Sequence, residues 1–356
     1  MTLFVQLHLL TSYPAANLNR EDTGRPKTLV YGGAERVRIS SQSLKRAIRT
    51  SSAFAAGVGS AIGVRSQRFA LALVEALEAR GLPRAEAVSR VEAVIEHDRL
   101  GKVARGKAQT QQLVQLGPDE LANLHALADR LATADTLSEK GMLVLTNPPR
   151  AADIAMFGRM LADNPRYNVE AAVQVAHAFS THRAVVEDDF FTAIDDLAGV
   201  DGGLGAPYVG LAQFAAGTFY SYVCVDTALL RDNLAGDVEL CADALAALVL
   251  AAMTVSPRGR QSAFASRARA SYALLEVGTE APRTLASAFQ HPVGEREGED
   301  DQLATSIRRL RAQKADFGRA YGEIFATVTE FDVSDPNAAA LAQLLAAARG
   351  PFEAPA

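Results

Sequence analysis

The sequence predicts an α+β fold in which a long helical segment interrupts one β-sheet. Apolar residues alternate with other residues at the N-terminus, in "LFVQLHLL" (residues 3–10), as in a strand. From about Gly63 the apolar period becomes helical. Strand-like stretches then return at 184–195, 217–226 and 268–277. Because strands flank the helices, the sheet is expected to be discontinuous in sequence.

The N-terminal strand should contact different neighbours on its two faces. One face carries Leu3, Val5, Leu7 and Leu9, and the other carries Phe4, Gln6 and His8, since successive side chains of a strand point to opposite sides. A helix-rich segment at 227–253 is long and apolar enough to cover the sheet.

The helical segment contains several predicted helices. Residues 68–97 should form two of them, because Gly81 is a typical C-terminal stop and Pro83 is suited to the start of the next helix. Further helices are expected at 118–133, 150–162 and 168–181. The basic stretch at 101–107 between them fits either a contact with a nucleic-acid strand or a solvated linker.

A glycine-rich segment, "LAGVDGGLGAPYVGLAQ" (197–213), cannot form a regular element. Its flanks resemble the two strands of one hairpin, so we predict an extended hairpin tip. Asp195 and Asp196 precede it, and a turn is a better interpretation for them than a metal site, because neighbouring strand residues point to opposite faces.

Basic residues gather on one predicted helix near the N-terminus. In "RVRISSQSLKRAIRTS" (36–51), a short strand should be followed by a helix with Ser40 or Ser41 as its N-cap. The exposed amide groups at this helix start would form an anion site. On a helical period Gln42, Lys45, Arg46 and Arg49 share one face, and Leu44, Ala47 and Ile48 share the opposite one.

Charge is distributed unevenly along the 356 residues. Residues 1–50 contain eight Lys/Arg and three Asp/Glu, whereas the remainder contains 28 and 38, and the formal net charge is −5. No acidic residue occurs between Glu35 and Glu75, so the basic face is not an ordinary mixed surface. A phosphate backbone is the polyanion that fits best. The predicted contacts in this stretch are Arg38, Ser40, Gln42, Ser43, Lys45, Arg46 and Arg49.

Other candidate contacts lie elsewhere in the chain. "SPRGRQS" (256–262) is small, basic and glycine-bearing, which makes Arg258, Arg260 and Gln261 secondary candidates for phosphate binding. Strands of nucleic acid also stack on exposed side chains. Candidates for base contacts are Phe157, Met160 and Tyr208, although a pair such as Phe157 and Met160 is more often part of a core.

No catalytic or metal-binding set can be assembled from the sequence. His8 could act as a general base, but a lone strand histidine is more often structural. His177 and His182 are five residues apart and do not share a helix face. Two cysteines are too few for a disulfide scaffold or a zinc cluster. We therefore expect no cofactor and no metal, no membrane-spanning or signal segment, and a cytoplasmic protein.

Several motifs in order resemble one known family. They are "LNRED", "GGAERVRISSQSLKRAIR", "FGRM", "VAHAFSTH", and "DFFTAIDDL" followed by "FAAGTFYSY". They resemble the CasC family of the RAMP superfamily, the backbone subunit of the type I-E CRISPR surveillance complex Cascade. The likeness extends from the first strand to beyond Tyr222 and is most specific in the first 50 residues.

The resemblance implies an RRM-like (ferredoxin-like) palm at 1–62 and 183–356, a helical fingers insertion at 63–182 and a thumb hairpin at 195–222. It implies a non-catalytic protein that binds guide RNA in several copies, with target DNA and the other Cascade subunits as partners. Its guide contacts carry over onto Arg20, Lys27, Ser40, Gln42, Lys45 and Arg49, and its "FGRM" motif adds Arg159 to Phe157 and Met160 as base-wedge or target-strand candidates. A RAMP-type endoribonuclease and a filament protein that assembles without RNA are the alternatives.

Overall fold

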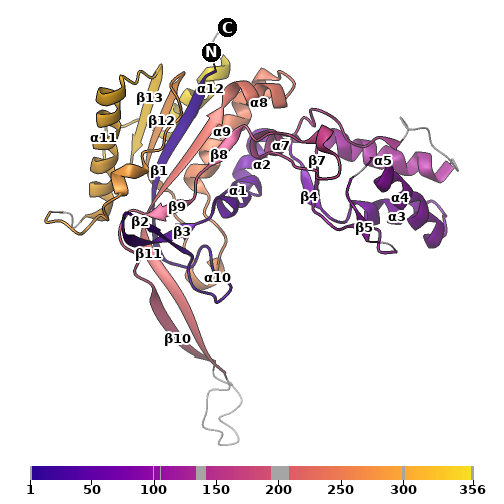
Figure 1. The fold of residues 1–356 in the computed structure, drawn as a ribbon, viewed down its shortest axis with the longest axis horizontal. Helices are drawn as coiled ribbons and strands as arrows, with labels where there is room; N and C mark the ends of the chain where they lie inside the picture. Colours follow the sequence, from indigo (N-terminus) through magenta and orange to yellow (C-terminus); the bar gives the residue numbers. More distant parts are fainter. Residues whose placement is uncertain are drawn as a thin grey trace, which may run out of the picture.

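A twisted antiparallel sheet with helices on both faces forms the larger part of the molecule (Figure 1). This computed structural model describes residues 2–98, 100–104, 106–133, 142–193, 208–298 and 301–353. The strand order is β13 (Thr327–Asp332), β12 (Ala270–Gly278), β1 (Phe4–Ala16), β11 (Tyr208–Asp226), β9 (Ala178–Ser180), β3 (Ala34–Ile39) and β2 (Thr28–Tyr31). The predicted α+β class is confirmed.

Strand β1 lies in the middle of this sheet and is buried on both faces. It pairs antiparallel with β11 and with β12, so that His8 lies opposite Tyr222 on one side and Leu274 on the other. Val5, Leu7 and Leu9 belong to one apolar core, whereas Leu10 belongs to the core on the opposite face. The alternation predicted for "LFVQLHLL" is therefore confirmed.

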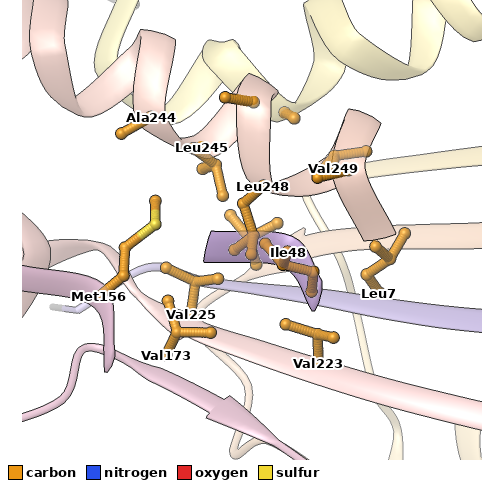
Figure 2. Packing of buried hydrophobic residues seen from close by; sticks show 14 of the residues in the cluster. Leu7, Ile48, Met156, Val173, Val223, Val225, Ala244, Leu245, Leu248 and Val249 are labelled. Atoms are coloured by element: carbon orange, nitrogen blue, oxygen red, sulfur yellow. The ribbon is translucent and has the colours of Figure 1, made fainter. Parts of the chain in front are cut away.

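The helices of one face are α1 (Ser41–Arg49), α2 (Ser52–Val58), α8 (Thr227–Asn233), α9 (Val238–Thr254) and α12 (Leu341–Glu353). Figure 2 shows Ile48 of α1 among Leu248 of α9 and Val223 of β11. Burying a side chain such as Ile48 contributes about 1.5–3 kcal/mol. This packing fixes α1 on the sheet by the face opposite its basic residues.

The other face of the sheet is covered by α11 (Gln302–Tyr321) and the short helix η3 (Ala286–Phe289). Ile307 and Leu310 of α11 pack there with Phe289 and with Tyr220 and Tyr272 of the sheet. Because both faces are covered, the middle strands contain apolar residues on both sides.

A helical block with its own core lies beside the sheet (Figure 1). Its elements are β4 (Val64–Ser66), α3 (Phe69–Glu78), α4 (Arg84–Asp98), β5 (Val103–Ala104), β6 (Gln109–Thr110), β7 (Val114–Leu116) and α5 (Pro118–Thr133). Gly81, with φ +93°, separates α3 from α4 as predicted. The helix predicted at 118–133 is confirmed.

The helix predicted at 168–181 is wrong. Residues there form β8 (Val173–Val175) and β9, which pair with β11, and β9 also pairs with β3. The 19-residue β11 extends far enough to offer backbone partners to both short strands. Only 152–157 of the helix predicted at 150–162 forms, as α7 (Ala152–Phe157), and a 3-10 turn, η1 (Pro165–Tyr167), follows.

Strand β10 (Glu187–Ala193) and the start of β11 form a hairpin that projects from the sheet (Figure 1). Their pairing extends to Ala193 opposite Tyr208. Most of the glycine-rich tip, with Asp195 and Asp196, lies outside the described residues, as does Arg105 of the 101–107 stretch. Among the helices that the structure describes, none is both long and apolar enough to cross a membrane.

Candidate nucleic-acid interface

A groove of about 590 Å³ runs between the basic face of α1 and the segment that follows α7. It brings together residues that lie more than 100 positions apart in the sequence. Its lining consists of Gln42, Lys45, Arg46, Arg49, Arg65, Leu113, Gln115, Phe157, Gly158, Arg159, Met160, Val169 and Ala171. The predicted basic face and the predicted base-wedge residues thus share one surface, which we call the α1 groove.

The α1 groove is positively charged. None of its lining residues is acidic. Among the described residues, the side chains of Lys45, Arg46 and Arg65 have no hydrogen bond or ion pair. Partial burial lowers the pKa of Lys45. Cations with free donors and no competing carboxylate suit a ligand with phosphate oxygens. Arg65 was not predicted, because it lies on β4, 16 residues beyond α1.

Arg49 ties the groove to the helical block. Its Nη1 lies 3.5 Å from Oδ2 of the buried Asp153. The same carboxylate accepts hydrogen bonds from the backbone N–H of Gly63 at 2.7 Å and from Nε2 of Gln115 at 2.6 Å. Burial raises the pKa of Asp153, and the Gly63 and Arg49 contacts oppose this shift. Asp153 therefore links α1, α7 and β7 next to the groove-lining residues Arg49 and Gln115.

The start of α1 is closed by the protein's own side chains. Ser40 is the N-cap, and its Oγ accepts from the Ser43 N–H. The Ser41 N–H donates to Nδ1 of His177 at 3.2 Å, and the Ser40 N–H donates to Asn19 Oδ1 at 2.8 Å. Burial lowers the pKa of His177, as do Arg38 and Lys27. The Ser41 and Ser43 N–H groups of this helix start therefore already have acceptors, whereas the Gln42 N–H has none among the described residues, and the anion site stays a prediction.

The other basic candidates near α1 have different environments. Arg20 is exposed and Lys27 is half-buried, both in the loop between β1 and β2. Arg38 donates to the Thr28 carbonyl and lies 3.3 Å from His177 Nδ1. Arg36 is buried, and its guanidinium donates to the carbonyls of Ser180, Thr181 and Phe289. Among the described residues, the side chains of the candidates Arg20 and Lys27 have no hydrogen bond or ion pair, whereas Arg38 and the neighbouring Arg36, which was not a candidate, donate to groups of the protein.

The residues of the "FGRM" motif (157–160) divide between core and surface. Phe157 is half-buried against the main core, with its ring 6.4 Å from that of Phe54. Met160 is 80% exposed. Gly158, with φ +80°, forms the turn between them. Tyr208 is exposed on the hairpin beside Phe191 and does not line the groove.

Arg159 lines the groove, but its side chain is held by buried partners. It is only 5% exposed, and its Nη1 lies 2.6 Å from the buried Glu120 carboxylate. It also donates to the carbonyls of Gln115 and Tyr167. Its donors are used inside the protein, so it cannot approach a base without breaking this network.

The secondary candidates lie at another groove, of about 750 Å³, between the start of α2 and the residues after α9. Arg258 and Gln261 line it, and Arg260 precedes the short helix α10 (Gln261–Phe264). Arg267 and Arg269 line the same groove and were not predicted, although their spacing of two could have indicated a shared strand face.

His8, the candidate general base, is fully buried. Its Nδ1 lies 2.9 Å from the Tyr220 hydroxyl and its Nε2 lies 3.4 Å from Glu276 Oε2. Burial lowers the pKa of His8, while Glu276 opposes the shift. A substrate has no access to this imidazole in the structure. Within the described ranges, no cluster of three or more His, Cys, Asp or Glu side chains could hold a metal ion.

The sequence of the chain matches the model of one known protein family. The model of the CT1975-like protein family matches residues 5–349. The chain belongs to this family. Two solved structures are similar to it along nearly all of its length. A chain of "CRISPR RNA-guided surveillance complex, pre-nicking" is 29% identical, with a TM-score of 0.83, and the match covers 97% of this chain and 100% of that one.

A second solved chain comes from "CRISPR RNA-guided surveillance complex". It is 25% identical, has a TM-score of 0.71, and the match covers 97% of this chain and 99% of that one. No curated protein matches the chain. The similarity to solved structures agrees with the fold class expected from the sequence.

Proposed function

We propose that the chain is a non-catalytic backbone subunit of a CRISPR surveillance complex, and more narrowly the CasC subunit of type I-E Cascade. Several copies would bind one guide RNA along its phosphates and present its bases for pairing with target DNA. Sequence recognition would then be delegated to base pairing. The CRISPR-complex origin of both solved relatives supports this assignment.

The observation that carries the proposal is the α1 groove. Lys45 and Arg46 face a surface without acidic residues, and Met160 is exposed on the opposite wall. Phosphate contacts position a strand without reading its sequence, and side chains such as Met160 can lie against its bases. Arg20, Lys27, Gln42 and Arg49 border or line the same region as further guide contacts.

We also propose the division into palm, fingers and thumb. The palm would comprise 1–62 and 183–356, the fingers 63–182, and the thumb the hairpin at 195–222. The pairing of β8 and β9 with the main sheet favours an earlier end for the fingers than residue 182. The separate core of the helical block supports a fingers unit that begins near β4.

The endoribonuclease alternative depends on His8 and is weakened by its burial. The filament alternative requires assembly without RNA, and it does not explain a groove in which Lys45 and Arg46 lack partners among the described residues.

The proposal is tested by purifying the tagged chain from its host and sequencing the RNA that accompanies it. Repeat–spacer RNA protected in regular segments is the expected result, and a Lys45→Ala/Arg46→Ala chain purified in parallel is the control that should lose it. Recovery of the same bulk cellular RNA with both chains would refute the proposal.

A further inference from the structure

The α1 groove contains one amide oxygen that the protein does not use itself. The cationic side chains of the groove can donate hydrogen bonds but cannot accept them. Of the described residues that line it, two carry a side-chain oxygen, Gln42 and Gln115. Oε1 of Gln42 accepts from the Ser41 hydroxyl at 3.4 Å. Oε1 of Gln115 has no donor within the described ranges, so it is available to a ligand.

The orientation of the Gln115 amide is fixed by the buried Asp153. Nε2 of Gln115 lies 2.6 Å from Oδ2 of Asp153, and Nη1 of Arg49 lies 3.5 Å from the same oxygen. Because a carboxylate oxygen accepts hydrogen bonds, the amide must turn its nitrogen towards Asp153 and leave its oxygen free. The backbone is held as well, since the Gln115 carbonyl accepts from Nη1 of Arg159 at 3.1 Å. Gln115 therefore offers the groove a positioned acceptor.

An acceptor in this groove does not suit a phosphate, because ionised phosphodiester oxygens also only accept. The donors of a nucleic-acid strand are the N–H groups of its bases and, in RNA, the 2′-hydroxyl of each ribose. Under the proposed function the base edges are reserved for pairing with the target. The 2′-hydroxyl, which DNA lacks, is then the donor that remains for Gln115.

We propose that Gln115 is a specificity-determining residue that accepts a hydrogen bond from a 2′-hydroxyl of the bound strand, and that Asp153 is the residue that positions it. The inference rests on the proposed function, because it concerns the strand held by the α1 groove. Phosphate contacts alone do not distinguish RNA from DNA, whereas this contact does. Gln115 lies on β7 of the helical block, so the block would contribute to the choice of nucleic acid.

The test measures, by fluorescence anisotropy, how much more tightly the full chain binds single-stranded RNA than its 2′-fluoro analogue. The analogue keeps the sugar pucker of RNA but has no hydroxyl proton to donate. The ratio of the two dissociation constants is taken for two unrelated sequences. Gln115→Met, which removes the acceptor at similar size, should lower this ratio about two- to tenfold, as expected for one neutral hydrogen bond. Gln112→Met, the same change at an exposed residue outside the groove, should keep the wild-type ratio.

Asp153→Asn tests the positioning role without changing Gln115. The backbone N–H groups of Gly63 and Ile154 donate to Oδ1 of Asp153 at 2.7 and 3.1 Å. The oxygen of the introduced amide must therefore stay at the Oδ1 position, and its nitrogen replaces Oδ2. Gln115 then has to turn its own oxygen towards this nitrogen, so the groove loses its acceptor. The ratio should fall as with Gln115→Met, although the loss of negative charge beside Arg49 strengthens binding of both nucleic acids.

Exchanging the two groups should restore the preference for RNA. In Asp153→Asn/Gln115→Glu, one oxygen of the new carboxylate accepts from the new amide nitrogen and the other is left for the strand. The added negative charge in the groove should weaken binding of RNA and of the analogue alike, but their ratio should return towards the wild-type value. A purely structural role of Asp153 gives no such rescue.

Each outcome decides the proposal. The wild-type chain provides the first arm, because equal affinity for RNA and the analogue overturns the proposal whether or not the variants fold. A ratio unchanged by Gln115→Met also overturns it, and a fall confined to one sequence overturns it by assigning the donor to a base. Lys45→Ala/Arg46→Ala in the same assay tests the proposed function separately. If that pair weakens binding while Gln115→Met leaves the ratio unchanged, the proposed function stands and this inference does not.

Discussion

Nη1 of Arg159 lies 2.6 Å from Oε2 of Glu120, and both side chains are buried beneath the α1 groove. Glu120 also accepts from the backbone N–H groups of Gly117 and Thr146. The pair thus joins α5 to the segment that carries Met160. It supports the groove wall although neither charge is available to a ligand.

Glu120→Ala should destabilise the protein by about 3–5 kcal/mol, because it leaves the Arg159 charge buried without a partner. Chemical denaturation measures this loss. As a control, Asp316→Ala removes the exposed partner of Arg319 and should cost no more than about 1 kcal/mol. Equal effects of the two substitutions would contradict the structural role of Arg159.

Stability should depend on pH through His8. Burial holds the pKa of His8 below its ordinary value, so the unfolded chain takes up a proton that the folded chain resists. The contribution is present above the unfolded pKa of about 6.5 and is lost as the pH falls towards the folded pKa. We expect the unfolding free energy to fall from pH 7 to pH 5. His8→Gln should flatten this fall, with a remainder from His177 and His182, whose pKa values are also lowered by burial. A slope unchanged by His8→Gln would show that His8 is not the responsible group.

The sequence predicted elements whose signals are local. The alternation around Val5 and Leu7, the basic face of α1 and the break at Gly81 all result from backbone periodicity or backbone freedom. Prediction from the sequence failed where pairing with a segment distant in the chain determines the secondary structure. Residues 173–175 and 178–180 are strands because β11 and β3 lie beside them.

The sequence also did not predict which arginine side chains are buried. Arg36 and Arg159 are basic residues within predicted contact motifs, yet each is enclosed by acceptors contributed by distant segments. His177 could not be assigned to the start of α1, because its partner Ser41 is 136 residues away. Only the three-dimensional arrangement distinguishes these structural cations from Lys45 and Arg46, whose side chains have no partner within the described ranges.

Met160 and Phe157 should have separable effects. Met160→Ala should change stability by less than about 0.5 kcal/mol, because its side chain is exposed, but it should increase the chemical reactivity of guide bases in the assembled complex. Phe157→Ala should also lower the melting temperature, since its ring packs on the core. Unchanged base reactivity with Met160→Ala would exclude the base-wedge role.

Shortening the hairpin should affect assembly more than folding. Replacing residues 194–207 by a short Gly-Ser turn would connect Ala193 to Tyr208, which are already paired. The main cores should remain intact, because they contain no residue of β10. We expect an unchanged melting temperature and a loss of cooperative binding in titrations with long RNA. Wild-type cooperativity would refute the thumb assignment.

The central claim is tested most directly by the salt dependence of RNA binding to Lys45→Ala/Arg46→Ala. These two residues are preferable to Arg49, whose removal would also leave the buried Asp153 without its cation. For unrelated single-stranded sequences, the account predicts an equal loss of affinity and a slope lowered by about 0.7 for each lost phosphate contact. An unchanged slope, or a loss confined to one sequence, would contradict it.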